Sequence, residues 1–302
     1  MSYRIRPGKD LTTEVVRIAE IQYDRAIETL GDQPKGRYQA IHDARKRFKK
    51  LRGLFRLVRD AAPDFYEAEN ARIRDMARTL STVRDATALV ETLDHLIESQ
   101  ATAENHDRLF SIRAWLADRL DRITREETDL EDKIEAAVST CGKGIEALAA
   151  LRLPKRRTKA IALLARGTAK NYGRAVIALQ TAVTSNEAAD WHDLRKRIKY
   201  HRMHVQLMSP AWPGELGLRA DVADIAGEAL GDDHDLACLE TLIATDPGAI
   251  GSDEDIAVLR TVMAARSVEL HEQIRGIVKN LLRDDKRVVR KRLAALWVDA
   301  AG

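Results

Sequence analysis

Apolar side chains recur along this chain every three or four residues, and no stretch of useful length shows the period of two that is typical of a strand. The pattern predicts helices, some of them broken into two, over roughly 11–30, 37–60, 64–99, 103–149, 156–184, 187–208, 214–245 and 253–299. Glycine and proline mark the breaks, at 31–36, Pro63, Pro154, Pro210, Pro213 and 247–251. We therefore expect an all-α protein.

The sequence repeats itself with an offset of 150 residues. IHDARKRFKKLRGLFRLV (41–58) aligns with WHDLRKRIKYHRMHVQLM (191–208), and eight of the 18 positions are identical. Two further pairs of segments match at nearly the same offset: LSTVRDATAL (80–89) with LGDDHDLACL (230–239), and QYDRAIETL (22–30) with NYGRAVIAL (171–179). Three matches in one order indicate an internal duplication.

Each half of the duplication supplies about four helices. We expect residues 1–150 to form one four-helix bundle and residues 151–302 to form a second, because four helices suffice to enclose a core. A pseudo-two-fold axis should relate the two bundles. The apolar fraction of 45 % is ordinary for a globular protein and is compatible with this arrangement.

The repeated helix carries positive charge on one face only. At about 100° per residue, the following residues fall within a wedge about 120° wide: His42, Arg45, Lys46, Lys49, Arg52 and Arg56. The second copy repeats this pattern with His192, Arg195, Lys196, Lys199 and Arg202, while Gln206 replaces the last arginine. We call these two sets the first and second basic wedges.

A solvated surface is the simplest interpretation of a charged helix face, but such faces usually mix signs. Like charges three or four residues apart repel by a few tenths of a kcal/mol per pair, and neither wedge contains an acid. The duplication of this costly pattern indicates two faces that serve one ligand. We therefore predict a basic groove or pore between or along the bundles.

Other basic residues extend the prediction. The segment from Arg152 to Arg174 holds eight lysines or arginines and no acid. From these and the last helix we add Lys159, Arg166, Lys170, Arg287 and Arg290 to the candidate binding residues. Arginine makes forked contacts with phosphate oxygens and lysine supplies a point charge, so the expected ligand is a phosphate polyanion. Its affinity should fall as salt rises.

The remaining composition adds few constraints. The 50 basic and 47 acidic residues give a net charge of only +3, so the distribution of charge matters more than its sum. Cys141 and Cys238 lack metal-site spacing, which favours a reducing cytoplasm without disulfides. We find no signal peptide and no run of about 18 apolar residues, and so expect no membrane contact through a spanning helix.

The histidines at the start of the wedges allow three interpretations. His42 and His192 donate hydrogen bonds to phosphate, bond to a carboxylate of a neighbouring helix, or take part in metal or phosphohistidine chemistry. A metal site needs three or four converging ligands, and a histidine flanked by cations is a poor start. His201 and His204 align with Leu51 and Leu54, so we expect them to be buried with satisfied polar tips.

No catalytic motif is found. The chain has no nucleophile elbow, P-loop or HExxH, and its glycines are isolated. Asp85 and Asp235 lie beside helix breaks, where capping or pairing with an arginine is a better explanation than catalysis. We therefore expect no catalytic residues, no metal, no cofactor and no enzymatic activity.

The chain resembles the conserved histidine α-helical domain (CHAD) family. The resemblance rests on the two HxxRKxxKxxR segments, on LGDDHDLACL (230–239), and on the opening YRIRPGKDLTTEVVRIAEIQYDRAIETL. It implies two four-helix bundles with pseudo-two-fold symmetry that bind inorganic polyphosphate along a basic pore or groove. Some members associate with polyphosphate granules in the cytoplasm. Many are fused to a triphosphate tunnel domain with an ExExK strand, which this sequence lacks, so triphosphatase activity is not implied.

The family's basic residues carry over to matching positions in both wedges. These are His42, Arg45, Lys49, Arg52, His192, Arg195, Lys199 and Arg202. Lys46 and Lys196 stand where the family commonly has a hydrophobic residue. Arg84 aligns with His234, which breaks the symmetry of the two halves.

Two alternatives to polyphosphate binding remain. A nucleic-acid binder usually pairs cations with stacking aromatics, and Trp191 and Tyr200 flank the second wedge, although the first has Ile41 and Lys50 there. A metal-dependent phosphohydrolase would use the histidines. The sequence specifies no oligomeric state.

Overall fold

The computed structural model describes residues 3–245 and 247–301, and all regular elements in these ranges are helical. In chain order they are α1 (Leu11–Asp32), α2 (Arg37–Val58), η1 (Arg59–Ala61), α3 (Pro63–Thr79), α4 (Thr82–Gln100), α5 (His106–Glu126), α6 (Leu130–Ala147), η2 (Leu148–Ala150), α7 (Arg157–Ser185), α8 (Ala188–Met208), η3 (Ser209–Ala211), α9 (Pro213–Thr245), α10 (Pro247–Ile250), α11 (Asp253–Leu281) and α12 (Lys286–Ala300). The prediction of an all-α fold is confirmed. Three predicted helices are broken into two, at 80–81, 127–129 and 282–285.

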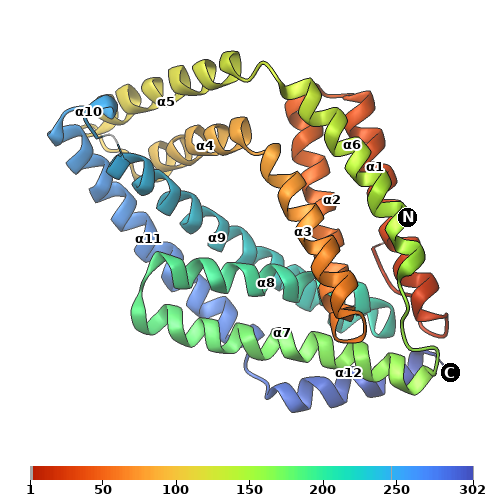
Figure 1. The fold of residues 1–302 in the computed structure, drawn as a ribbon. Coiled ribbons are helices and arrows are strands. Elements are labelled where there is room, and N and C mark those ends of the chain that lie inside the picture. Colours follow the sequence, from red (N-terminus) through yellow and green to blue (C-terminus); the bar gives the residue numbers. More distant parts are fainter. Residues whose placement is uncertain (1–2, 246, 302) are drawn as a thin grey trace.

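The two copies of the repeat differ at one of these breaks. The break at 80–81 separates α3 from α4, whereas the aligned positions 230–231 lie inside the continuous helix α9. As a result α4 turns away from α2 and α3 and runs with α5 to the far end of α9 and α11 (Figure 1). The first copy therefore has two helices that point in different directions, α3 and α4, where the second copy has the single helix α9.

Two hydrophobic cores hold the helices together. The first joins α1, α2, α3 and α6 to the start of α7, the end of α8 and α12. The second joins α4 and α5 to the rest of α7 and α8 and to α9 and α11. Both cores contain residues from before and after residue 150. The two copies of the repeat therefore share both cores and do not each enclose a core of their own. The assignment of 1–150 and 151–302 as two domains stays a prediction.

Helices α2 and α8 cross at equivalent positions of the repeat. Gly53 of α2 lies against Met203 of α8, and a Cβ atom on Gly53 would stand 2.5 Å from the Met203 sulfur. Glycine inside a helix costs roughly 0.5–1 kcal/mol relative to alanine. Here it allows the two wedge-bearing helices to approach closely, which brings their polar faces to one place.

The N-terminal segment crosses this junction and is tied to both helices. The Tyr3 hydroxyl donates to the carbonyl of Lys50 in α2 at 2.7 Å, and the Ile5 amide donates to the carbonyl of Leu207 in α8 at 2.9 Å. Tyr3 and Ile5 are both buried. The segment therefore adds hydrogen bonds and apolar contacts to the crossing of α2 and α8.

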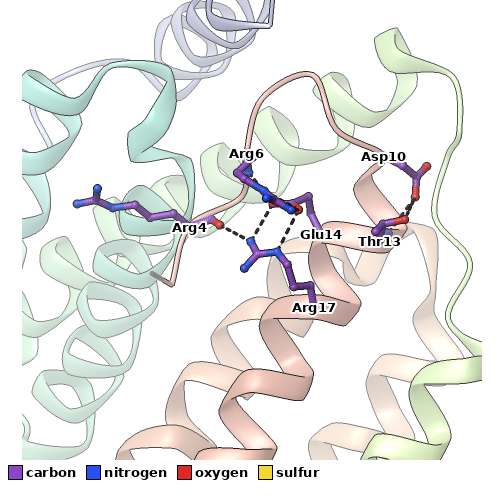
Figure 2. Close-up of polar contacts among 6 residues, drawn as sticks. All are labelled: Arg4, Arg6, Asp10, Thr13, Glu14 and Arg17. Carbon is purple, nitrogen blue, oxygen red and sulfur yellow. Dashed lines mark hydrogen bonds and ion pairs between the residues drawn. The ribbon is translucent and has the colours of Figure 1, made fainter. Parts of the chain in front are cut away.

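A buried carboxylate anchors the segment to α1. Figure 2 shows the side chains of Arg6 and Arg17 pointing to Glu14, while the Arg17 guanidinium also donates to the carbonyl of Arg4 at 3.1 Å. Glu14 is fully buried and accepts from the Arg6 amide at 2.8 Å, from Arg6 Nε at 2.9 Å and from Arg17 Nη2 at 2.9 Å. Burial raises the pKa of Glu14, but the hydrogen bonds from Arg17 and Arg6 outweigh it and lower the pKa to about 2.

We predict that Glu14 makes the fold sensitive to acid. Because its folded pKa is depressed from 4.5 to about 2, its contribution is present above about pH 4.5 and is lost as the pH falls toward 2. Glu14→Gln should lower the free energy of unfolding at pH 7 by about 3 kcal/mol and flatten its pH dependence between pH 3 and 5. Urea unfolding across that range measures both effects. The control is Asp75→Asn, which removes an exposed ion pair with Arg74 and should leave the free energy of unfolding nearly unchanged. If Glu14→Gln also left it nearly unchanged, the anchoring role of Glu14 would be contradicted.

A second prediction concerns the contact between α7 and α2. A Cβ atom on Gly167 of α7 would collide with the backbone carbonyl oxygen of Leu57 in α2, which a rotamer change cannot relieve. Gly167→Ala should therefore destabilise the protein by about 1–3 kcal/mol. Gly142 in α6 has no such neighbour within 4 Å, so Gly142→Ala should stabilise it by about 0.5–1 kcal/mol. Thermal unfolding of the two variants checks the opposite signs, and equal shifts would show that α7 can move off α2.

Candidate functional site

The first basic wedge is held in place by neighbouring helices. Arg45 donates to the carbonyl of Ala77 at 2.6 Å, and Arg52 Nε donates to Asn70 Oδ1 at 3.0 Å. Both partners belong to α3, which runs beside α2. These bonds orient the two guanidinium groups before any ligand arrives, so a ligand would find them ordered at little further entropic cost.

The second wedge has comparable supports on α9. The Arg202 guanidinium lies 2.6 Å from the carboxylate of Asp224. Burial lowers the pKa of Arg195, while the carboxylate of Asp235 opposes this shift, and the Nε atom of Arg195 is buried without a hydrogen-bond partner in the described structure. The wedge arginines are thus positioned by α3 on one side and by α9 on the other.

Asp85 and Asp235, which the sequence placed beside helix breaks, differ in position: Asp85 follows the break between α3 and α4, whereas Asp235 lies inside the continuous helix α9. Asp85 lies 4.0 Å from Arg45, which is compatible with the expected pairing. Asp235, the aligned residue, faces Arg195: burial raises the pKa of Asp235, and the charges of Arg195 and Lys199 oppose that rise. Each copy of the repeat therefore has a carboxylate whose charge acts on its first wedge arginine, although only Asp85 lies within ion-pair distance in the described ranges.

Lys49 and Lys199 lie where the two wedges meet. Burial and then the charges of Arg195, Arg45 and Arg84 lower the pKa of Lys49 to about 8. Burial and then the charges of Arg195 and Lys49 lower the pKa of Lys199 to about 7. The side chain of Lys49 nevertheless stays exposed to water. The two ammonium groups are thus surrounded by helices and by other cations in a place that an anion in solution can reach.

The other members of the wedges are spread around this centre. Lys46 and Lys196 each pair with the acid three residues earlier, Asp43 and Asp193, at 3.2 Å. The Arg56 guanidinium lies over the ring of Tyr200 in α8, 4.1 Å from its centroid. Arg56 therefore helps to hold the helix crossing instead of projecting into solvent.

The histidines at the wedge starts differ between the copies. His192 Nδ1 lies 3.0 Å from His234 Nδ1, and the two rings are 4.2 Å apart. Burial, followed by the charges of Arg195 and His192, lowers the pKa of His234 to about 4. His42 has no such partner in the described ranges; burial, then Lys46 and Arg84, lower its pKa. Neither His42 nor His192 bonds to a carboxylate in the described ranges, and His192 contacts His234 of α9 instead; the choice among the three interpretations stays a prediction.

Arg84 is a residue near the wedges that the sequence prediction left out of the candidate site. It pairs with Glu91 at 2.7 Å and lines two adjoining cavities. One, of about 230 Å³, also includes His42, and the other, of about 200 Å³, includes Asp235. The signal was present in the alignment, because Arg84 stands opposite His234, the partner of His192.

The outlying candidates lie apart from the wedges. Arg166 and Lys170 of α7 pair with Asp60 in η1, at 3.5 and 3.0 Å. Lys159 is exposed near the start of α7, and Arg287 and Arg290 are exposed near the start of α12. In residues 3–245 and 247–301, no hydrogen bond or ion pair joins these five to Lys49 or Lys199. The structure thus brings the wedges together and leaves the additional residues at the periphery.

His201 and His204 are buried as expected, with 2 % and no exposure. The ring nitrogens of His201 have no protein hydrogen-bond partner among the described residues, whereas His204 has a backbone contact with Gly53, so satisfied polar tips stay a prediction. Burial lowers the pKa of His201 to about 4 and that of His204 to about 3, which keeps both rings neutral. Both histidines are packing residues of α8.

The part of the chain that the structure describes has no group of three or more metal-ligating side chains arranged around one point. Its two cysteines are free, Cys141 buried and Cys238 exposed. Among the same residues, every helix is too short or too polar to cross a bilayer.

Comparisons with known proteins agree with the observed fold. The family model of the CHAD domain matches residues 22–244. The crystal structure of the CHAD domain from the plant Ricinus communis superposes with a TM-score of 0.60 at 15 % sequence identity, covering 92 % of this chain and 96 % of that one. No curated protein matches the sequence significantly. Because the family model spans well over half of the sequence and the folds agree, this chain belongs to the CHAD domain family.

Proposed function

We propose that this protein binds inorganic polyphosphate in a basic groove to which both wedges contribute, and that it acts by binding and not by catalysis. The observation that carries the proposal is the convergence of Lys49, Lys199 and Arg195 from both copies of the repeat. Cations are gathered at such density only at a cost, which a bound polyanion would offset. We further propose a cytoplasmic location at polyphosphate granules, as the family membership implies.

The groove has the features of a pseudo-two-fold site. The equivalent residues Gly53 and Met203 meet at the crossing. The equivalent arginines Arg45 and Arg195 lie near the equivalent carboxylates of Asp85 and Asp235. A polyphosphate chain offers the same charged group at every repeat, so it suits a site built twice from one motif. In this proposal, successive phosphates contact one wedge, then Lys49 and Lys199, then the other wedge.

The aromatic residues beside the second wedge favour polyphosphate over nucleic acid. Trp191 is 1 % exposed and stacks on His271 with ring centroids 3.8 Å apart. The ring of Tyr200 is covered by Arg56. Single-stranded nucleic acids gain about 1–3 kcal/mol per base by stacking on free aromatic faces; Trp191 offers none, and Arg56 already lies over the ring of Tyr200.

Reversing the two central charges should abolish binding. Lys49→Glu combined with Lys199→Glu places carboxylates among arginines, so the fold should persist while the affinity for polyphosphate falls at least about 100-fold. Fluorescence titration at low salt measures the loss, and circular dichroism checks the helices. The control, Lys143→Glu with Lys279→Glu, makes the same charge change on exposed lysines of α6 and α11 and should lower affinity less than about threefold. Equal losses in both variants would reject the central site.

Competition should separate polyphosphate from nucleic acid. Long-chain polyphosphate should bind with an affinity that falls steeply as salt rises, and single-stranded RNA of equal charge should fail to displace it. Displacement by RNA at equal charge would mean a generic polyanion surface. The same samples with added divalent metals should release no phosphate in a colorimetric assay, and a release that His42→Ala abolishes would contradict the non-catalytic role.

A further inference from the structure

Lys49 and Lys199 occupy equivalent positions at the crossing of α2 and α8. Each stands four residues, about 6 Å along the helix axis, before the contact of Gly53 with Met203. Within the described ranges neither ammonium group has a carboxylate within 4.0 Å, whereas Lys46 and Lys196 each have one at 3.2 Å. The crossing therefore brings together the two wedge lysines that lack an acid of their own.

The groups that face these lysines come from four helices and are mostly cationic. They are Arg45 from α2, Arg84 from α4, Arg195 and Arg202 from α8, and Asp232 and Asp235 from α9. The imidazoles of His192 and His234 also lie within electrostatic reach of Lys199, and that of His42 lies within reach of Lys49. Four guanidinium groups and two carboxylates thus surround the two amines, so the cations still outnumber the acids and a positive charge on either amine is disfavoured while no anion is bound.

Resting on the proposed function, we propose that Lys49 and Lys199 form a proton-linked anion subsite, in which a phosphate group that bridges them takes up protons from solvent as it binds. Each neutral amine accepts one proton from water or buffer and then donates a hydrogen bond to a phosphate oxygen. No bond of the ligand breaks. The anion supplies the negative charge that the crossing lacks, and so it restores both lysines to the ammonium form.

The pH dependence of binding follows from this arrangement. The free protein holds Lys49 and Lys199 with pKa values of about 8 and about 7, and an adjacent phosphate raises both toward or above 10.5. The complex therefore carries more protons than the free protein between about pH 7 and 10, and its affinity must fall as the pH rises through that range. The depressed pKa values of His192 and His234 keep those rings neutral above pH 8, so they add little there.

Calorimetric titration with long-chain inorganic polyphosphate at about pH 8, in two buffers of different ionisation enthalpy, measures the proton uptake directly. The wild-type protein should take up about one proton or more on binding. Lys49→Arg with Lys199→Arg keeps both charges at all relevant pH values, because arginine does not titrate. This variant should still bind, with less than half of the uptake. The control, Lys143→Arg with Lys279→Arg, makes the same exchange outside the groove and should take up as many protons as the wild type.

The outcomes separate the subsite from the function on which it rests. No binding by the wild type at low salt overturns both. If the wild type binds without taking up protons, polyphosphate binding stands and the proton linkage is rejected. If the arginine variant takes up as many protons as the wild type, the protons go to other groups and the linkage through Lys49 and Lys199 is rejected as well. Should the arginine variant fail to fold, the wild type alone decides: its affinity should fall at least about tenfold between pH 7.5 and 9.5, and a flat profile rejects the subsite.

Discussion

The architecture depends on the close crossing of α2 and α8. Gly53 lets the two helices meet at Met203, and the N-terminal segment, held by Glu14, bonds to both of them. Each helix presents an apolar face to a core and a basic wedge to the shared region. The crossing therefore couples stability to charge density: the same contact that completes the packing forces lysines of like charge into one place.

The distribution of acids shows how the fold tolerates this charge. Carboxylates support the arginines at the ends of the wedges, as Asp85 does for Arg45 and Asp224 for Arg202. At the centre, Asp235 and Asp232 of α9 face the lysines, but in the described ranges neither lies within 4.0 Å of Lys49 or Lys199. Charge is thus neutralised at the ends of the wedges and left less compensated around Lys49 and Lys199. Such an arrangement costs the free protein some stability, which a bound polyanion of the proposed kind would offset.

Helical periodicity and the 150-residue repeat were sufficient to predict the all-α class, most helix positions and the faces that carry charge. They could not predict that α3 and α4 would break apart where α9 is continuous, because Ser81 and Gly231 are both tolerated in a helix interior or at its end. They also missed that both cores mix residues from the two halves, since periodicity identifies an apolar face but not its partner. For the same reason the sequence identified the wedges but left Arg84, which reaches them from another helix, outside the site.

The asymmetry of the two copies bears on the kind of ligand. His192 bonds to His234, whereas His42 faces Arg84, so the two ends of the site offer different donors to an anion. A ligand whose successive groups differ chemically would require one specific arrangement of hydrogen-bond donors. A chain of identical phosphates does not, because each unit can accept from an imidazole, a guanidinium or an ammonium group. The two copies differ at positions 84 and 234 but both keep Lys49 or Lys199 and the wedge arginines, and a uniform polyanion, the ligand class proposed above, would tolerate that difference.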